Sequence, residues 1–296
     1  MKTNIQPFFH PASSTISYIV FDVESRAAVI IDSPLDFCPQ SGVLSTQFAD
    51  QQIEFIHAQR LHICWILETH AHADHLTAAS YLKHKLNAKI AVSEDIVQVQ
   101  ASFQSIFNLS QQTIQKSKQR FDRLLCDEEE LTFGQTILKV IKTPGHTPDS
   151  LTFLIENHAF IGDTLFMPDI GSARCDFPKG SAATLYNSIQ RIYALPEETI
   201  LWMCHDYQPN GRDVAYHIPL KEMREKNLHI QHTTNLDAFV LQREERDRGL
   251  AVPKLLYPAI QVNLCAGTLP QDDHGQCFLK IPVTLSQPIE WAKLND

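Results

Sequence analysis

The chain has 296 residues, of which 44% are hydrophobic and 20% charged; these are ordinary globular values and exclude disorder throughout the chain. Its formal net charge of -9 argues against a nucleic-acid groove, because such a groove needs a basic stripe that replaces counterions. No stretch approaches the ~20 apolar residues of a transmembrane helix, and Pro7 and Pro11 interrupt the N-terminal residues before a secretory core could form.

The first third of the chain alternates predicted strands and helices. Residues 16–21 and 27–31 are β-branched apolar runs around a polar turn and predict a hairpin. Residues 42–60 predict a helix, and the short apolar run 63–67 predicts a buried strand. A helix over residues 76–86 and a strand over 89–92 follow.

The rest of the chain is predicted to return to strands and end in polar helices. Residues 103–118 are compatible with a helix or a surface excursion. The further predicted strands and helices, in chain order, are strands 121–125, 136–141, 151–155 and 158–161, helix 181–195, strand 200–203, and helices 219–231 and 236–248. A tail interrupted by prolines completes the chain.

This order of elements indicates an α/β (α+β) protein with two sheets flanked by helices. We expect one catalytic domain over residues 1–215 and a helical extension over residues 216–296 that packs on the same domain. The seven cysteines form an odd set without a CxxC pair, which points to reduced thiols. We therefore expect a cytoplasmic protein.

The strongest chemical signal is the sequence THAHADH at residues 69–75, directly after a predicted strand. It places three imidazoles and one carboxylate within six residues. We expect His70 and His72 to face one point, and Asp74 and His75 to face a second. Imidazole together with carboxylate suits zinc, iron or manganese.

Three more candidate ligands follow predicted strands elsewhere in the chain. His146 comes after Pro-Gly, a pair that suits a tight turn with positive φ at the glycine. Asp163 follows Gly162, and His205 follows the strand 200–203. Loops at strand ends carry chemistry on a rigid scaffold, so their shared placement supports all three. The other nine histidines have no ligand-like spacing.

Two other polar residues allow a less specific interpretation. Asp32 follows the strand 27–31 and is expected either to orient the histidine loop or to cap the next turn. Ser150 has no paired base at motif spacing, and the chain has no GxSxG motif, so serine-nucleophile catalysis is not supported.

These motifs resemble the metallo-β-lactamase superfamily in type and order, over roughly residues 14–215. The matching stretches are THAHADH at 69–75, PGHTPDS at 144–150, GDTLF at 162–166 and CHDY at 204–207. The resemblance implies an αββα sandwich of two mixed sheets, with the metal at one sheet edge. It does not fix the reaction, because one fold carries many chemistries.

Within the superfamily, the chain resembles the persulfide dioxygenases and their glyoxalase II relatives. Ala173 to Phe177, ARCDF, is similar to the GRTDF stretch of the dioxygenases, with Cys175 in place of threonine. The stretch IQVNLCAGTLP at 260–270 is similar to a bacterial subgroup called β-lactamase-like hydrolases and linked to sulfide handling.

The resemblance implies one Fe²⁺ per subunit, held by His70, His146 and Asp163, with Arg174 and Asp176 as further catalytic residues. Two histidines and one carboxylate leave positions open for O₂ and a substrate sulfur. The implied reaction turns glutathione persulfide, O₂ and water into glutathione and sulfite. The other four candidate ligands would then support the first three or remain from a second metal site.

The glyoxalase II alternative uses all seven residues to hold two Zn²⁺ ions ~3.5–4 Å apart. This resemblance implies that Asp163 and a hydroxide bridge the two ions, and that the hydroxide attacks a thioester. The ligand sets of both reactions are present. The small-molecule thiol substrate is expected to contact Arg174, Tyr207, Arg212 and Lys221, although Lys221 also fits a solvated helix position. Cys175, next to Arg174, is either a redox-sensitive thiol or, as we favour, inert.

Other classes of function fit the sequence less well. A nucleic-acid-processing metallohydrolase would need a basic surface, and a binding or scaffold protein would have lost ligands. A β-lactam hydrolase conflicts with the Arg174 stretch and the C-terminal extension. We expect no nucleic-acid or membrane partner, and a homodimer or tetramer by resemblance to relatives.

Overall fold

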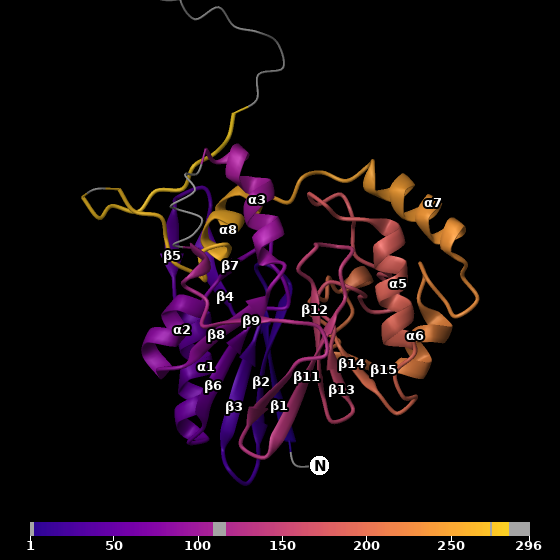
Figure 1. The fold of residues 1–296 in the computed structure, drawn as a ribbon, viewed down its shortest axis with the longest axis horizontal. Coiled ribbons are helices and arrows are strands. Elements are labelled where there is room, and N and C mark those ends of the chain that lie inside the picture. The colour runs from indigo at the N-terminus through magenta and orange to yellow at the C-terminus, as the bar shows by residue number, and fades with distance from the viewer. Residues whose placement is uncertain (1–2, 109–116, 273, 284–296) are drawn as a thin grey trace, which may run out of the picture.

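The protein is described by a computed structural model over residues 3–108, 117–272 and 274–283. Two six-stranded sheets stand side by side at the centre, and helices cover the outer side of each (Figure 1). The strand order is β1-β2-β3-β6-β8-β9 in one sheet and β10-β11-β12-β13-β14-β15 in the other. This arrangement is the predicted αββα sandwich.

The first sheet comes from the N-terminal half. Its strands are β1 (Thr3–His10), β2 (Thr15–Asp22), β3 (Ala27–Ile31), β6 (His62–Leu67), β8 (Lys89–Ser93) and β9 (Arg123–Leu125). The helices of this half are α1 (Gln47–Ala58), α2 (Ala79–Leu86) and α3 (Ile96–Ile106). β3, β6, β8 and β9 run parallel, so their carboxyl ends meet at one edge. A small sheet of β5 (Val43–Ser45), β4 (Pro34–Cys38) and β7 (Leu76–Thr77) lies beside them.

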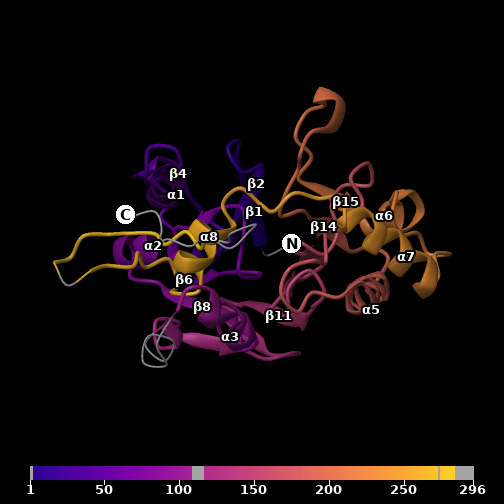
Figure 2. The ribbon, with the colours of Figure 1, turned by 90° about the horizontal axis from the view of Figure 1, so that it is seen from above.

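The second sheet comes from the C-terminal half. Its strands are β10 (Glu130–Phe133), β11 (Thr136–Lys142), β12 (Leu151–Ile155), β13 (His158–Phe160), β14 (Ile200–Trp202) and β15 (His217–Pro219). The helices α5 (Ala182–Tyr193), α6 (Leu220–Lys226) and α7 (Leu236–Asp247) belong to this half, and η1 (Pro209–Gly211) is a short turn. α8 (Leu256–Asn263) crosses back to the first half, where it contacts β7, and the view from above shows it over that half, away from α5, α6 and α7 (Figure 2).

The core has two layers, and β2 contributes to both. Ile16, Tyr18 and Val20 pack between the two sheets. Ile19 and Phe21 face the helices of the first half. Because successive strand side chains point to opposite faces, a strand covered on both faces is apolar throughout, which explains why all eight residues of β2 are buried.

Several predicted boundaries differ from the structure. The helix predicted over 42–60 begins only at Gln47, because residues 43–45 pair with β4. The helix predicted from residue 76 begins at Ala79, because β7 pairs with β4. The sequence analysis did not identify β1, which contains Pro7; β1 is an edge strand, where a missing N–H is tolerated.

The C-terminal region also differs from the prediction. The helix predicted over 219–231 is shorter, since residues 217–219 form β15 and α6 ends at Lys226. β15 pairs with β14 of the second sheet, so this strand of the predicted extension, C-terminal to residue 215, belongs to the sandwich. The predicted tail contains α8. Of the stretch 103–118, residues up to Ile106 belong to α3, and residues 109–116 lie outside the described residues. In the described ranges no helix is long and apolar enough to cross a membrane.

Candidate metal centre

The histidine loop is fixed by the ends of two neighbouring parallel strands, β3 and β6. Asp32, which follows β3, accepts hydrogen bonds from the backbone N–H of Thr69 (2.7 Å) and from its hydroxyl (2.8 Å). Its Oδ1 also lies 3.0 Å from Nε2 of His72. Burial alone would raise the pKa of Asp32, but His72 and these donors hold it below the usual value. Of its two predicted roles, Asp32 therefore has the first, to orient the histidine loop.

A first group of ligand atoms consists of His70, His146 and Asp163, whose ligand atoms lie within 4.8 Å of one another. Nε2 of His70 lies 3.9 Å from Oδ2 of Asp163, and Nε2 of His146 lies 3.8 Å from the same oxygen. Gly145, with φ +141, turns the chain so that His146 follows β11. The three residues come from three loops, which the sandwich brings to one edge.

A second group consists of His72, Asp74, His75 and His205. Nε2 of His205 lies 3.4 Å from Oδ2 of Asp74 and 3.4 Å from Oδ1 of Asp163. Asp163 therefore directs one oxygen at each group. This division differs from the predicted one, because His72 joins Asp74 and His75 rather than His70, although the rings of His70 and His72 are only 4.1 Å apart.

The atoms left without hydrogen bonds test whether a metal fits. Six ligand atoms are buried and lack a hydrogen-bond partner among the described residues: Nε2 of His70, Nδ1 of His72, Oδ2 of Asp74, Nε2 of His75, Oδ1 of Asp163 and Nε2 of His205. Buried polar atoms are almost always paired, so six unpaired atoms at one place indicate a missing cation. The donor set therefore fits a metal centre.

In each imidazole of the centre, the other ring nitrogen has a partner in the protein. Nδ1 of His70 lies 3.0 Å from the hydroxyl of Thr69, and Nδ1 of His146 lies 2.7 Å from the carbonyl oxygen of Arg174. Such contacts fix the ring and the tautomer of a metal ligand. For His75 and His205 the partner is one hydroxyl, that of Thr15, at 3.2 and 3.4 Å.

A metal binds the neutral form of imidazole, and the surroundings shift the pKa values of these imidazoles in opposite directions. Against the effect of burial, Asp32 raises the pKa of His72 well above its usual value, and Asp163 and Asp74 raise that of His205. Burial lowers the pKa of His70 well below its usual value and that of His75 to about 4. Burial favours the protonated form of the nearby thiols, because it raises the pKa of Cys204 well above its usual value and that of Cys175 to about 12. The inert interpretation of Cys175 is the one that agrees with this shift.

Two of the predicted substrate-contacting residues lie beside the centre. The ring of Tyr207 stacks on His205 with centroids 5.8 Å apart, and 52% of the residue is exposed. Arg174 forms two hydrogen bonds of 2.6 Å to Asp176 and one of 2.9 Å to the carbonyl of Ala251. Its backbone carbonyl holds His146, so the Arg174 stretch borders the first group of ligands.

The other two predicted substrate-contacting residues have different surroundings. Arg212 donates two hydrogen bonds, of 2.6 and 2.7 Å, to the buried carboxylate of Asp206, and two to Asp169. Its guanidinium is thus already used to hold the loop after His205. Lys221 lies in α6, whose first residue donates to Thr199 at the start of β14. His205 follows the other end of β14, so the length of this strand separates Lys221 from His205. The structure therefore does not bring Lys221 to the site.

The sequence analysis missed residues that support the loop from a distance. Asp149 accepts a hydrogen bond from the N–H of Ala71 (2.9 Å). Asn263 of α8 contacts the loop at three backbone atoms. Asp149 lies inside the PGHTPDS stretch at 144–150, and its place in this motif could have marked it as a residue that supports the site. Nothing local to Asn263 marks it, because its partners are far away in the sequence.

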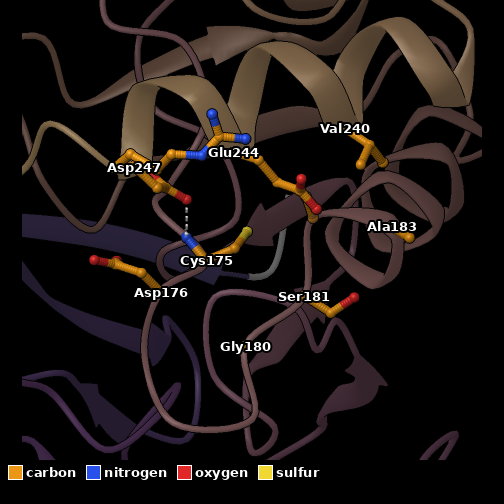
Figure 3. Close-up of a pocket in the computed structure, with 10 residues that line it drawn as sticks. Cys175, Asp176, Gly180, Ser181, Ala183, Val240, Glu244 and Asp247 are labelled. Carbon is orange, nitrogen blue, oxygen red and sulfur yellow. Dashed lines mark hydrogen bonds between the residues drawn. The ribbon is translucent and has the colours of Figure 1, made fainter.

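A cavity of about 410 Å³ lies next to the Arg174 stretch, between residues 175–181 and the helices α5 and α7 (Figure 3). Asp176, Glu244 and Asp247 make it acidic, with Arg248 as the one cation in its lining. Its lining includes none of the seven predicted ligands, all of which are described. At the wall of the cavity, the backbone N–H of Cys175 donates to Asp247 (2.8 Å), and this bond joins α7 to the stretch that holds His146.

Comparisons with known proteins agree with this geometry. The chain is 44% identical over 290 residues to a probable metallo-hydrolase of Burkholderia pseudomallei (94% of this chain, 98% of the relative). It is 31% identical over 266 residues to the bovine mitochondrial persulfide dioxygenase ETHE1 (89% of this chain, 88% of the relative). The crystal structure of ETHE1 from Myxococcus xanthus matches with a TM-score of 0.71 and 27% identity, over 90% of this chain and 100% of that one. The family model of the metallo-beta-lactamase superfamily matches residues 19–205. The chain is therefore a metal-dependent enzyme that belongs to the metallo-beta-lactamase superfamily.

Proposed function

We propose that this enzyme is a persulfide dioxygenase. It would convert glutathione persulfide, O₂ and water into glutathione, sulfite and two protons, with one Fe²⁺ per subunit. The observation that carries the proposal is the group of His70, His146 and Asp163, two imidazoles and one carboxylate whose ligand atoms converge within 4.8 Å. This donor set is typical of non-haem iron oxygenases.

When bound there, ferrous iron supplies open positions at which a persulfide sulfur and O₂ can react. The protein supplies the arrangement around it. The carbonyl of Arg174 accepts from Nδ1 of His146 and so directs Nε2 of that ring to the centre. All three ligands are buried, which keeps bulk water from the reacting atoms.

The substrate would enter past Tyr207, whose exposed ring stacks on His205. Hydrogen bonds to Asp176 and Ala251 use three of the five guanidinium N–H groups of Arg174, and the other two would donate to a glutathione carboxylate. Arg212 and Lys221 are not part of this proposal, because Arg212 is occupied by two carboxylates and Lys221 lies beyond the other end of β14. The likeness to the bovine persulfide dioxygenase supports the same branch.

The second candidate function is a thioester hydrolase with two zinc ions. It is favoured by the second group, His72, Asp74, His75 and His205, and by the two oxygens of Asp163, one directed at each group. These residues, with Asp163 serving both groups, would hold two metals, which would supply a nucleophilic hydroxide for attack on a thioester. A relative from Dictyostelium discoideum named Glyoxylase B2, 44% identical over 285 residues, supports this alternative (95% of this chain, 97% of the relative).

One experiment separates the two functions. Protein reconstituted anaerobically with Fe²⁺ is given glutathione persulfide, and O₂ uptake and sulfite are measured; zinc-loaded protein is given a glutathione thioester. The proposal expects O₂ uptake that His146→Ala abolishes and Asp74→Asn largely retains, because Asp74 belongs only to the second group. No uptake at full iron occupancy would refute it. Thioester hydrolysis that Asp74→Asn abolishes would establish the alternative.

A further inference from the structure

Asn263 ends α8, a helix outside the residues that the family model matches, yet its side chain reaches the metal-binding loop. Its Oδ1 accepts a hydrogen bond from the backbone N–H of Thr77 (2.8 Å). Its Nδ2 donates to the carbonyl oxygens of His72 (2.8 Å) and His75 (2.8 Å). The residue is only 6% exposed, so these bonds are shielded from water.

These three bonds use the particular chemistry of an amide side chain. A carboxamide has two N–H donors and one carbonyl acceptor, and all of these groups of Asn263 are engaged with one loop. The loop has no helix or strand between Leu67 and Leu76 to satisfy its own backbone groups. An unpaired buried backbone group costs about 1–3 kcal/mol, so an external partner is needed.

A second observation shows that α8 is built to sit on this loop. Gly267, in the turn after α8, has φ +82, and a Cβ there would lie 2.9 Å from the carbonyl oxygen of Thr77 and 2.9 Å from the N–H of Ser80. A side chain at residue 267 would therefore push the turn away from Thr77 and Ser80, which lie in β7 and α2 directly after the loop. Gln100 of α3 also donates to the carbonyl of Leu264 (3.1 Å), which ties the end of α8 to the first half.

We infer that Asn263 is a positioning residue of the metal centre. It holds the backbone at His72 and His75 so that both rings keep their free nitrogens at the second group of ligands. The C-terminal helix thereby sets part of the metal affinity. The inference concerns metal binding at the second group of ligands, which can be measured without either proposed reaction.

The test measures metal affinity and needs no substrate. Metal-free protein is titrated with zinc against a chromogenic chelator for the wild type, Asn263→Asp and Asn263→Ala. Asp keeps the size and the acceptor but has no donors for the two carbonyls. We expect zinc affinity to fall ~10- to 100-fold in both variants, as for other residues that orient ligands.

Gln261→Ala is the matched control. Gln261 lies two residues earlier in α8, is 8% exposed, and makes three hydrogen bonds, all to Tyr257 and Lys280 and none to the loop. Its loss should lower stability and leave zinc affinity within about threefold of the wild type, because the ligand-bearing loop keeps its partners. Equal affinity in wild type and folded Asn263 variants, or an equal loss in Gln261→Ala, would overturn the inference.

A measurement on the wild type covers the case in which the Asn263 variants do not fold. If α8 raises the affinity of the site for zinc, then bound zinc must stabilise the packing of α8 on the loop by the same free energy. We expect backbone amides of α8 to exchange hydrogen more slowly in zinc-loaded than in metal-free protein, while those of α7, which packs on α5, change little. Identical exchange of α8 in both states would contradict the inference.

Discussion

The buried ion pair between Arg243 and Asp247 allows a quantitative test of how α7 supports the site. Arg243 is 4% exposed and donates to Oδ1 of Asp247 from Nε (3.0 Å) and from Nη2 (2.7 Å). Its third contact is the carbonyl of Ser172 (3.1 Å). Oδ2 of Asp247 accepts from the N–H of Cys175, so this carboxylate joins α7 to the stretch that holds His146.

Replacing Asp247 by Ala removes the charge and both hydrogen-bond acceptors at once. Arg243 then stays buried with a single acceptor, and breaking a buried pair in this way costs about 3–5 kcal/mol. At about 2 °C per kcal/mol for a chain of this size, the melting temperature should fall by roughly 6 °C or more. The control is Glu222→Ala, which breaks the pair with Lys226 at the same i,i+4 spacing. That pair is exposed, so its loss should shift the melting temperature far less than the loss of the buried pair.

Thermal unfolding followed by circular dichroism measures both variants at fixed metal content. A further variant, Arg243→Met with Asp247→Leu, removes both charges and should recover much of the loss, because apolar residues of similar volume replace buried pairs at little cost. If Asp247→Ala is no less stable than Glu222→Ala, Arg243 is solvated in the protein. In that case α7 does not anchor the Cys175 stretch through a buried ion pair.

Three further predictions concern the turn at the centre, the pH dependence and the metal. Gly145→Ala should destabilise the protein by about 1–3 kcal/mol, because alanine is strained at the φ of this residue. It should also weaken zinc binding at His146, because the new Cβ would lie 2.4 Å from the backbone of α5. Gly211→Ala, at φ +73 with open space around it, is the control for the unfolding and the zinc-binding measurements. Hydrogen bonds from backbone N–H groups, first of all that of Ser25, lower the pKa of Asp22 to about 2. The ionised carboxylate therefore contributes about 2 kcal/mol to the free energy of unfolding above pH 4, and this contribution is lost as the pH falls toward 2. The stability difference between wild type and Asp22→Asn, measured by urea unfolding, should therefore shrink over that range; a constant difference would contradict it. Removal of the metal with a chelator should lower the melting temperature, and zinc at 100 times its Kd should restore about 2.7 kcal/mol; an unchanged melting temperature would count against a metal centre.

The sequence by itself determined the candidate metal ligands and the class of fold. THAHADH, His146, Asp163 and His205 each follow a strand whose apolar run is visible in the sequence, so both the donor types and their placement are local information. The alternation of strands and helices likewise predicted two sheets with helices outside, because periodicity follows from which faces are covered. The predicted starts of α1 and α2 were wrong, because the residues before each helix pair with β4 instead.

Only the tertiary structure decided which residues hold those ligands in place. Asn263 lies 191 residues from His72 and 188 from His75, and no periodicity or motif links such distant positions. Arg212 fitted a substrate-binding residue in the sequence, yet the fold pairs it with Asp206 and Asp169. A side chain's type limits the contacts it can make, but the partner it meets depends on packing between elements remote in the chain, which the order of residues alone does not specify.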